Sequence, residues 1–130
     1  MATEILLNDG GAPARILPFT AGGTVTAGNL LIVNSAGEVV NADSGTTGYD
    51  FAGIGFALTT VTSGNIASVI TGHGVVLNIN AKDVGPGVAL MMGTTAGEML
   101  TADNGDGSPM TQAVCLEDTS ADGLHRCITV

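Results

Sequence analysis

The sequence is poor in basic and in aromatic residues. Its 130 residues include three Lys and Arg against 12 Asp and Glu, which gives a formal net charge of -9 at pH 7. Nucleic-acid binding depends on basic side chains that neutralise phosphates, so this balance argues against a nucleic-acid partner. Aromatic residues make up 3% of the chain, too few for a surface on which unpaired bases stack. An anionic membrane would also repel so acidic a chain.

Long hydrophobic runs and a disulfide framework are missing as well. No apolar run approaches the length of a membrane span, and the opening MATEILLNDGG lacks the basic region of a signal peptide. The chain has two cysteines, Cys115 and Cys127. If the strands that carry them form a hairpin, the two side chains can face each other as a disulfide or as buried thiols. A reducing cytosol favours thiols, and we expect the chain to be made in the cytoplasm.

Helical periodicity is nearly absent from the sequence. Short apolar runs are bounded instead by Gly, Asn, Asp and Ser, which suit tight turns. Strands at spacings of about 8–12 residues are typical of a small all-β sandwich or barrel, which is the fold class that we predict. The predicted strands are Glu4–Asn8, Ala14–Phe19, Asn29–Asn34, Glu38–Ala42, Phe51–Thr59, Ile66–Thr71, Val75–Asn80, Val88–Met92, Glu98–Ala102, Thr111–Glu117 and Leu124–Val130.

An internal repeat is the clearest pattern in the chain. Residues 36–45, AGEVVNADSG, match residues 96–105, AGEMLTADNG, at an offset of 60. In front of this match, VTAG aligns with VGPG at an offset of 59, and behind it Ile54–Phe56 aligns with Val114–Leu116 at 60. Each copy is composed of a strand, a hairpin turn, a second strand, a loop and a third strand. The pattern predicts a duplicated three-strand unit, two copies of which could pack face to face or close into a barrel.

The first 20 residues lie outside the repeat. They contain two apolar runs and two prolines, Pro13 and Pro18, which disfavour a central strand. We predict an extended N-terminal arm over residues 1–20 and a single β-domain over residues 21–130, which we expect to fold without the arm.

Residues that could carry chemistry are few and scattered. His73 and His125 are isolated, and no nucleophile-elbow, zinc-protease or phosphate-loop motif is present. A triad of Cys115, His73 and an aspartate is conceivable, but no motif in the sequence points to it. The loop from Asp103 to Ser108 offers oxygen ligands for calcium but departs from the EF-hand order, so a turn is the better interpretation. We expect no enzyme activity, no catalytic residues, no metal and no cofactor.

The order of the motifs resembles the small capsid decoration, or cement, proteins of tailed bacteriophages, of the lambda type. The resemblance covers roughly residues 20–105 and rests on Val25–Asp43, Phe51–Leu58, Ser63–Val76 and Val84–Leu90. It implies a small β-tulip fold on the outer capsid surface of the virion, commonly as a homotrimer, that stabilises the expanded head against the pressure of packaged DNA. The implied partner is the major capsid protein.

Proteins of this family often reach onto the shell with an N-terminal arm, which adds a strand to a shell-protein sheet. By position alone, Thr3–Phe19 would make those contacts in this chain. The candidate capsid-contact residues are Glu4, Ile5, Leu6, Leu7, Arg15, Ile16, Leu17 and Phe19.

Two alternatives belong to other classes. A fibre or receptor-binding module of a virion suits a chain with little charge and much Thr, Asn and Gly, but it predicts exposed aromatics for glycan contact, and this chain has one Tyr and three Phe. A small ligand-binding β-barrel predicts a cavity with convergent polar groups, and a cupin would also need a cluster of histidines.

Overall fold

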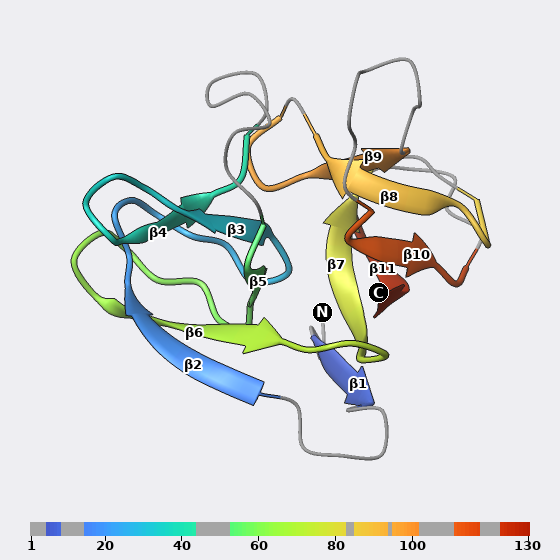
Figure 1. Ribbon diagram of the computed structural model, residues 1–130, viewed down its shortest axis with the longest axis horizontal. Helices are drawn as coiled ribbons and strands as arrows, with labels where there is room; N and C mark the ends of the chain where they lie inside the picture. The colour runs from blue at the N-terminus through green and yellow to red at the C-terminus, as the bar shows by residue number, and fades with distance from the viewer. Residues whose placement is uncertain are drawn as a thin grey trace.

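The computed structural model describes residues 5–8, 15–43, 53–82, 85–93, 95–101, 111–117 and 123–130. These residues form strands and no helix (Figure 1). The strands are β1 (Leu6–Asn8), β2 (Arg15–Thr20), β3 (Leu30–Val33), β4 (Val39–Asn41), β5 (Gly55–Ala57), β6 (Ile66–Thr71), β7 (Val76–Ala81), β8 (Ala89–Met92), β9 (Met99–Thr101), β10 (Ala113–Cys115) and β11 (Gly123–Thr129). Each overlaps one of the predicted runs, and the all-β, sandwich-like fold class is confirmed.

The strands form two antiparallel sheets with the same internal order. One sheet has the order β2-β6-β5-β3-β4, and the other has the order β7-β11-β10-β8-β9 with β1 added beside β7. Figure 1 shows the first sheet on the left and the second on the right. We call β2–β6 unit 1 and β7–β11 unit 2. The duplication therefore spans five strands in each unit, two more than the sequence predicts.

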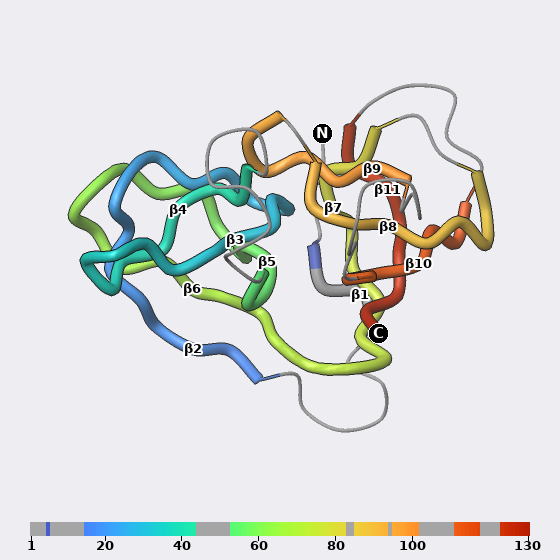
Figure 2. Tube along the Cα trace, turned by 45° about the horizontal axis from the view of Figure 1, so that its top comes forward, coloured from blue at the N-terminus to red at the C-terminus, as the bar shows by residue number. Residues whose placement is uncertain are grey.

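In both units the last strand of the sheet returns to the first. Ala81, at the end of β7, pairs in parallel with Met99 of β9. The equivalent bridge in unit 1 joins Ala21, directly after β2, to Val39 of β4, again in parallel. The two bridges are related by an offset of 60 at both partners, whereas the repeat predicts 59 for residues before Ala36. Each sheet therefore curls toward a small barrel, as the tube in Figure 2 also shows for unit 1.

The pairing of the first two repeat strands confirms the predicted shift in offset. Leu31 of β3 pairs with Asn41 of β4. In unit 2, Leu90 of β8 pairs with Thr101 of β9. The offset is thus 59 for the first strand and 60 for the second, with one extra residue in the unit 2 hairpin.

The alignment predicted for the third repeat strand is wrong by two residues. Gly55 occupies the position in unit 1 that Ala113 occupies in unit 2, because each pairs with the matched residue of β3 or β8. The offset there is 58, so Ile54–Phe56 does not match Val114–Leu116. The reason is that two fewer residues separate β9 from β10 than separate β4 from β5.

The AGE motif lies in the turn of the corresponding hairpin in both units. Gly37 and Gly97 both have a φ of +80°, a backbone conformation that glycine adopts without a steric penalty. In the first turn, the Gly37 amide donates to the Asn34 carbonyl at 3.0 Å. The duplicated glycines therefore mark duplicated turns.

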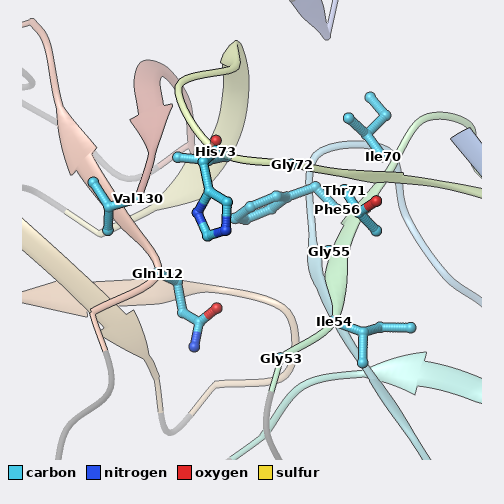
Figure 3. Close-up of a pocket in the computed structure, with 11 residues that line it drawn as sticks. Gly53, Ile54, Gly55, Phe56, Ile70, Thr71, Gly72, His73, Gln112 and Val130 are labelled. Carbon is cyan, nitrogen blue, oxygen red and sulfur yellow. The ribbon is translucent and has the colours of Figure 1, made fainter. Parts of the chain in front are cut away.

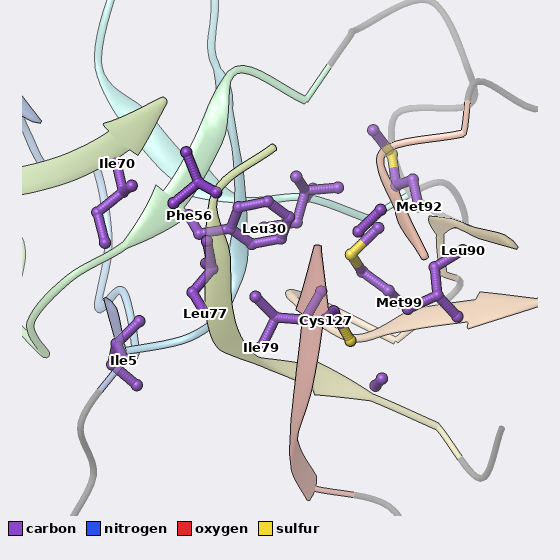
Figure 4. Close-up of a cluster of buried hydrophobic side chains, with 14 of the residues drawn as sticks. Ile5, Leu30, Phe56, Ile70, Leu77, Ile79, Leu90, Met92, Met99 and Cys127 are labelled. Atoms are coloured by element: carbon purple, nitrogen blue, oxygen red, sulfur yellow. The ribbon is translucent and has the colours of Figure 1, made fainter. Parts of the chain in front are cut away.

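The core consists of two clusters of buried side chains. The smaller lies within unit 1 and comprises Ala21, Val25, Leu31, Val39, Ala57, Ala67 and Val69. The larger one joins the two units: Figure 4 shows Leu30 and Phe56 of unit 1 in one cluster with Leu77, Ile79 and Cys127 of unit 2. Alternate residues of β7 are buried, as expected for a strand with one face in the core. The two units thus share part of their hydrophobic core.

The described part of the predicted arm is extended and paired. β1 pairs antiparallel with β7, and all six residues of β2 pair antiparallel with β6. The two segments lie at the edges of different sheets (Figure 1). Residues 15–20 are therefore an integral strand of unit 1.

Candidate functional surface

The first four candidate contact residues lie at β1. Ile5 is 3% exposed and belongs to the larger core cluster. Leu6 and Leu7 are part of β1, whose backbone pairs with β7. Glu4 lies outside the described residues. Ile5 therefore stabilises the fold in this structure and is not available to a partner.

The other four candidates lie on β2, and three of them are exposed. Ile16 is 47% exposed and Leu17 is 36% exposed. Arg15 is also exposed, whereas Phe19 is half-buried against the unit 1 cluster. Of the predicted contact residues that the structure describes, those on β2 are placed to meet another molecule.

The outer edge of β2 presents backbone groups away from its own sheet. The Ala21 amide donates to the Asn65 carbonyl at 2.9 Å, on the side of β6. Backbone groups alternate in direction along a strand, so the odd-numbered residues of β2 face β6 and Ile16, Pro18 and Thr20 face outward. Pro18 has no amide hydrogen to donate, which fits an outward position on an edge strand. Among the described residues, strand pairing on this side of β2 is confined to its end, where Ala21 is bridged to Val39 of β4.

Exposed apolar side chains accompany this edge on one face of the sheet. Ile66 of β6 is 59% exposed and lies opposite Thr20, and Pro18 and Ile16 follow on the same face. Ile66 was not among the residues predicted from the sequence; its place beside β2 follows from a pairing that the sequence does not reveal. β2 and β6 contain no acidic residue, and Arg15 is their one charged side chain. In a chain with a net charge of -9, these two strands therefore add no negative side chain to the edge.

A pocket of about 280 Å³ lies where the two units meet (Figure 3). It is formed by equivalent ends of β5–β6 and β10–β11, with Thr71 in unit 1 and Thr129 in unit 2. Figure 3 shows the side chains of His73 and Gln112 beside the ring of Phe56. The side chains of the described residues that line it include no carboxylate and no thiol.

The two cysteines face each other across a hairpin, as predicted. Cys115 of β10 pairs in register with Cys127 of β11, and both are free and buried. The Cys115 thiol contacts the backbone oxygen of Glu117 at 3.1 Å. Burial, followed by the neighbouring Cys115, raises the pKa of the Cys127 thiol far above its usual range. Cys115 itself is fully buried, and a buried cysteine is a poor nucleophile, which argues against the triad of Cys115 and His73 considered above.

Glu117 joins the ends of this hairpin. Its Oε1 accepts a hydrogen bond from the Arg126 amide at 2.9 Å and lies 3.6 Å from Nδ1 of His125. Elsewhere in the described ranges, no three His, Cys, Asp or Glu side chains gather as a metal site would require. The calcium loop considered at Asp103 lies outside the residues described. Where the structure describes the chain, it contains no helix that could cross a membrane.

Comparison with known proteins shows a likeness in fold. No family model and no curated protein sequence matches the chain. A solved structure does match: the head fiber gp8.5 N base of bacteriophage phi29, with a TM-score of 0.61 and 16% sequence identity. The likeness covers 91% of this chain and 95% of that one. The two chains share a fold. The likeness extends over both units of the fold. At this level of identity, it says nothing by itself about activity.

Proposed function

We propose that this protein is a structural component of a bacteriophage head and acts as a decoration protein on the outer surface of the shell. The observation that carries the proposal is the match in fold, along nearly the whole chain, to the base of a phage head fibre. The resemblance of residues 20–105 to phage decoration proteins, found in the motifs alone, points to the same place in a virion. Two independent kinds of likeness thus support a head protein.

The charge and the surface of the molecule fit this location. A net charge of -9 disfavours a site beside packaged DNA inside the head and suits its outer surface. The apolar edge at β2 offers a contact surface with a single charged side chain, Arg15. We expect its partner to be the major capsid protein.

The physical role would follow from selective binding. A protein that binds the expanded shell more tightly than other states of the shell stabilises the expanded state by mass action. Binding as a homotrimer would combine three weak contacts into one tight attachment. No catalytic step and no cofactor is part of this proposal.

A fibre base is the second candidate, and the phi29 structure specifically favours it. In that case the chain would bind the head in the same way but carry a projecting part. The two functions differ in what extends outward from the head, so images of decorated heads distinguish them. A thin layer flush with the shell indicates decoration, and a projecting rod indicates a fibre.

Co-sedimentation tests the proposal directly. Purified heads from the phage that encodes the chain are stripped of their outer proteins, mixed with the recombinant protein and pelleted. The proposal predicts saturable binding and heads that withstand higher temperature before they release DNA. Protein that stays in the supernatant at every concentration would refute it. Bovine serum albumin, which is also acidic, serves as the control for non-specific pelleting.

A further inference from the structure

The two units differ in what covers the outer edge of their first strand. Since Ala21 and Ala81 are equivalent, Leu17 of β2 corresponds to Leu77 of β7. Leu77 is fully buried, with 0% of its surface exposed, whereas Leu17 is 36% exposed. The same position of a duplicated sheet is therefore sealed in unit 2 and open in unit 1.

In unit 2, the cover is a short added strand. β1 pairs antiparallel with β7, and Ile5 packs in the same cluster as Leu77 (Figure 4). The outward amide of Asn78 donates to the Ile5 carbonyl at 2.7 Å, and that of Asn80 donates to the Gly28 carbonyl at 2.8 Å. The edge of β7 is thus satisfied by backbone pairing together with one buried aliphatic side chain.

We infer that the outer edge of β2 accepts an antiparallel strand from another polypeptide, in the place that β1 occupies on unit 2. The inference rests on the proposed function in taking this strand from the shell protein of the head. Addition of a strand to a sheet edge gains affinity from main-chain hydrogen bonds and specificity from alternate side chains. At β2 the available groups are those of Ile16 together with the Pro18 carbonyl.

A second copy of this chain is a poor donor for two reasons. Each copy contains one β1 and two first-strand edges, so exchange of β1 between copies always leaves one edge per copy uncovered. Direct pairing of two β2 edges would place Pro18 in both strands and remove two amide donors, whereas a foreign strand meets one proline. A different polypeptide can therefore satisfy every copy.

The edge also defines the chemistry of the incoming strand. Its centre should be aliphatic, because it would lie beside Ile16 and cover Leu17 as Ile5 covers Leu77. An antiparallel strand ends beside the start of β2, where Arg15 is exposed. A carboxylate at the C-terminal end of the strand would pair with that guanidinium. The partner segment is thus a short aliphatic strand followed by an acidic residue.

The test uses prolines that change the outer edge and leave the β2–β6 pairing intact. Ile16→Pro removes an outward amide, and Pro18→Val restores a missing one. The control, Leu124→Ser, alters a side chain that is 37% exposed on unit 2. Each full-length variant is checked by circular dichroism and thermal melting. Binding is then measured to stripped heads and to a fluorescent peptide, TEILLND, whose sequence is that of residues 3–9.

The inference predicts that Ile16→Pro binds heads and peptide about tenfold more weakly than the wild type, because an amide donor is lost and the ring obstructs the incoming strand. Pro18→Val should bind both more tightly, and Leu124→Ser should be unchanged. Equal binding by the wild type and a folded Ile16→Pro variant overturns the inference. If Ile16→Pro does not fold, Pro18→Val decides, and binding no tighter than the wild type overturns it.

The two binding partners separate this inference from the proposed function. If the wild type and the variants bind the peptide with affinities in the predicted order but do not bind heads, the proposed function fails and the strand-accepting edge stands. If heads bind all variants equally, the head protein assignment stands and the edge is refuted. A new dimer of Pro18→Val, without tighter peptide binding, would show that the edge is built for a second copy and would also refute the inference.

Discussion

Replacement of Ile5 by alanine tests whether the N-terminal segment is part of the core. Ile5 is 3% exposed in the larger cluster. The substitution removes three carbon atoms, each worth about 0.8 kcal/mol of transfer free energy. The cavity left behind adds to this loss, so the free energy of unfolding should fall by about 3 kcal/mol. For a domain of this size, that corresponds to a melting temperature lower by about 12 °C.

The matched control is Ile16→Ala, the same substitution on the other N-terminal strand. Ile16 is 47% exposed, so its truncation should change the free energy of unfolding by less than about 1 kcal/mol. Urea unfolding followed by circular dichroism measures both variants and shows whether the denaturant slope stays constant. Equal destabilisation by the two substitutions would refute the placement of Ile5 in the core.

Three further predictions use positions that the duplication or the register brings together. Gly37→Ala should lower the free energy of unfolding by about 1–2 kcal/mol, because alanine is strained in the left-handed backbone conformation at this position. Gly97→Ala should lower it clearly more, because the new methyl group would also meet the Asn29 side chain. Equal losses of free energy in urea unfolding would contradict this prediction. Cys115 and Cys127 should react with a thiol reagent only after unfolding and without prior reduction; rapid labelling of the native protein would show that they are accessible. Because the fold raises the pKa of Cys127 above its ordinary value of 9.0, the unfolded state loses that proton first, and stability should fall as the pH rises above about 9. Unfolding in urea between pH 8 and pH 11 measures this slope, which should be smaller in Cys127→Ala and would contradict the reasoning if it were the same.

The strands and turns could be predicted because their signals are local. Alternation of apolar and polar residues located the strands, and the AGE motif located two turns that both contain a glycine at φ of +80°. The two repeat strands that flank each turn were also found, with the correct change of offset between them. These features depend on residues that are neighbours in sequence.

The full extent of the duplication could not be predicted because its outer strands share shape rather than sequence. β2 reads RILPFT and β7 reads VLNINA, yet both begin a five-stranded sheet, and an alanine at or directly after the end of each is bridged to the last strand of the sheet. Likewise, Ala57 opposite Val69 in unit 1 becomes Cys115 opposite Cys127 in unit 2. Backbone pairing preserves these positions, whereas packing accepts any small apolar side chain there.

The N-terminal segment shows where a proline is compatible with a strand. Pro18 disfavours a central strand, and β2 is an edge strand in which the nitrogen of Pro18 faces outward, so the residue is compatible with the sheet. Residues 1–20 were predicted as an arm, and the structure pairs their described parts with β6 and β7. Their removal would expose both partner strands, which argues against the expectation that residues 21–130 fold alone.

The candidate surface was predicted in part. Three predicted contact residues, Arg15, Ile16 and Leu17, are exposed on β2. Ile5 was also predicted as a contact but is buried, and Ile66, which lies beside β2, was not predicted. Contacts between residues far apart in the chain decide exposure, and a single sequence does not contain them.

The central claim is that this chain is part of the outer surface of a phage head. Its most direct test is quantitative mass spectrometry of purified virus particles from the source that encodes it, with the copy number measured against the major shell protein. The proposal predicts a ratio near one or near a simple fraction of one. Absence of the chain from purified particles would contradict it.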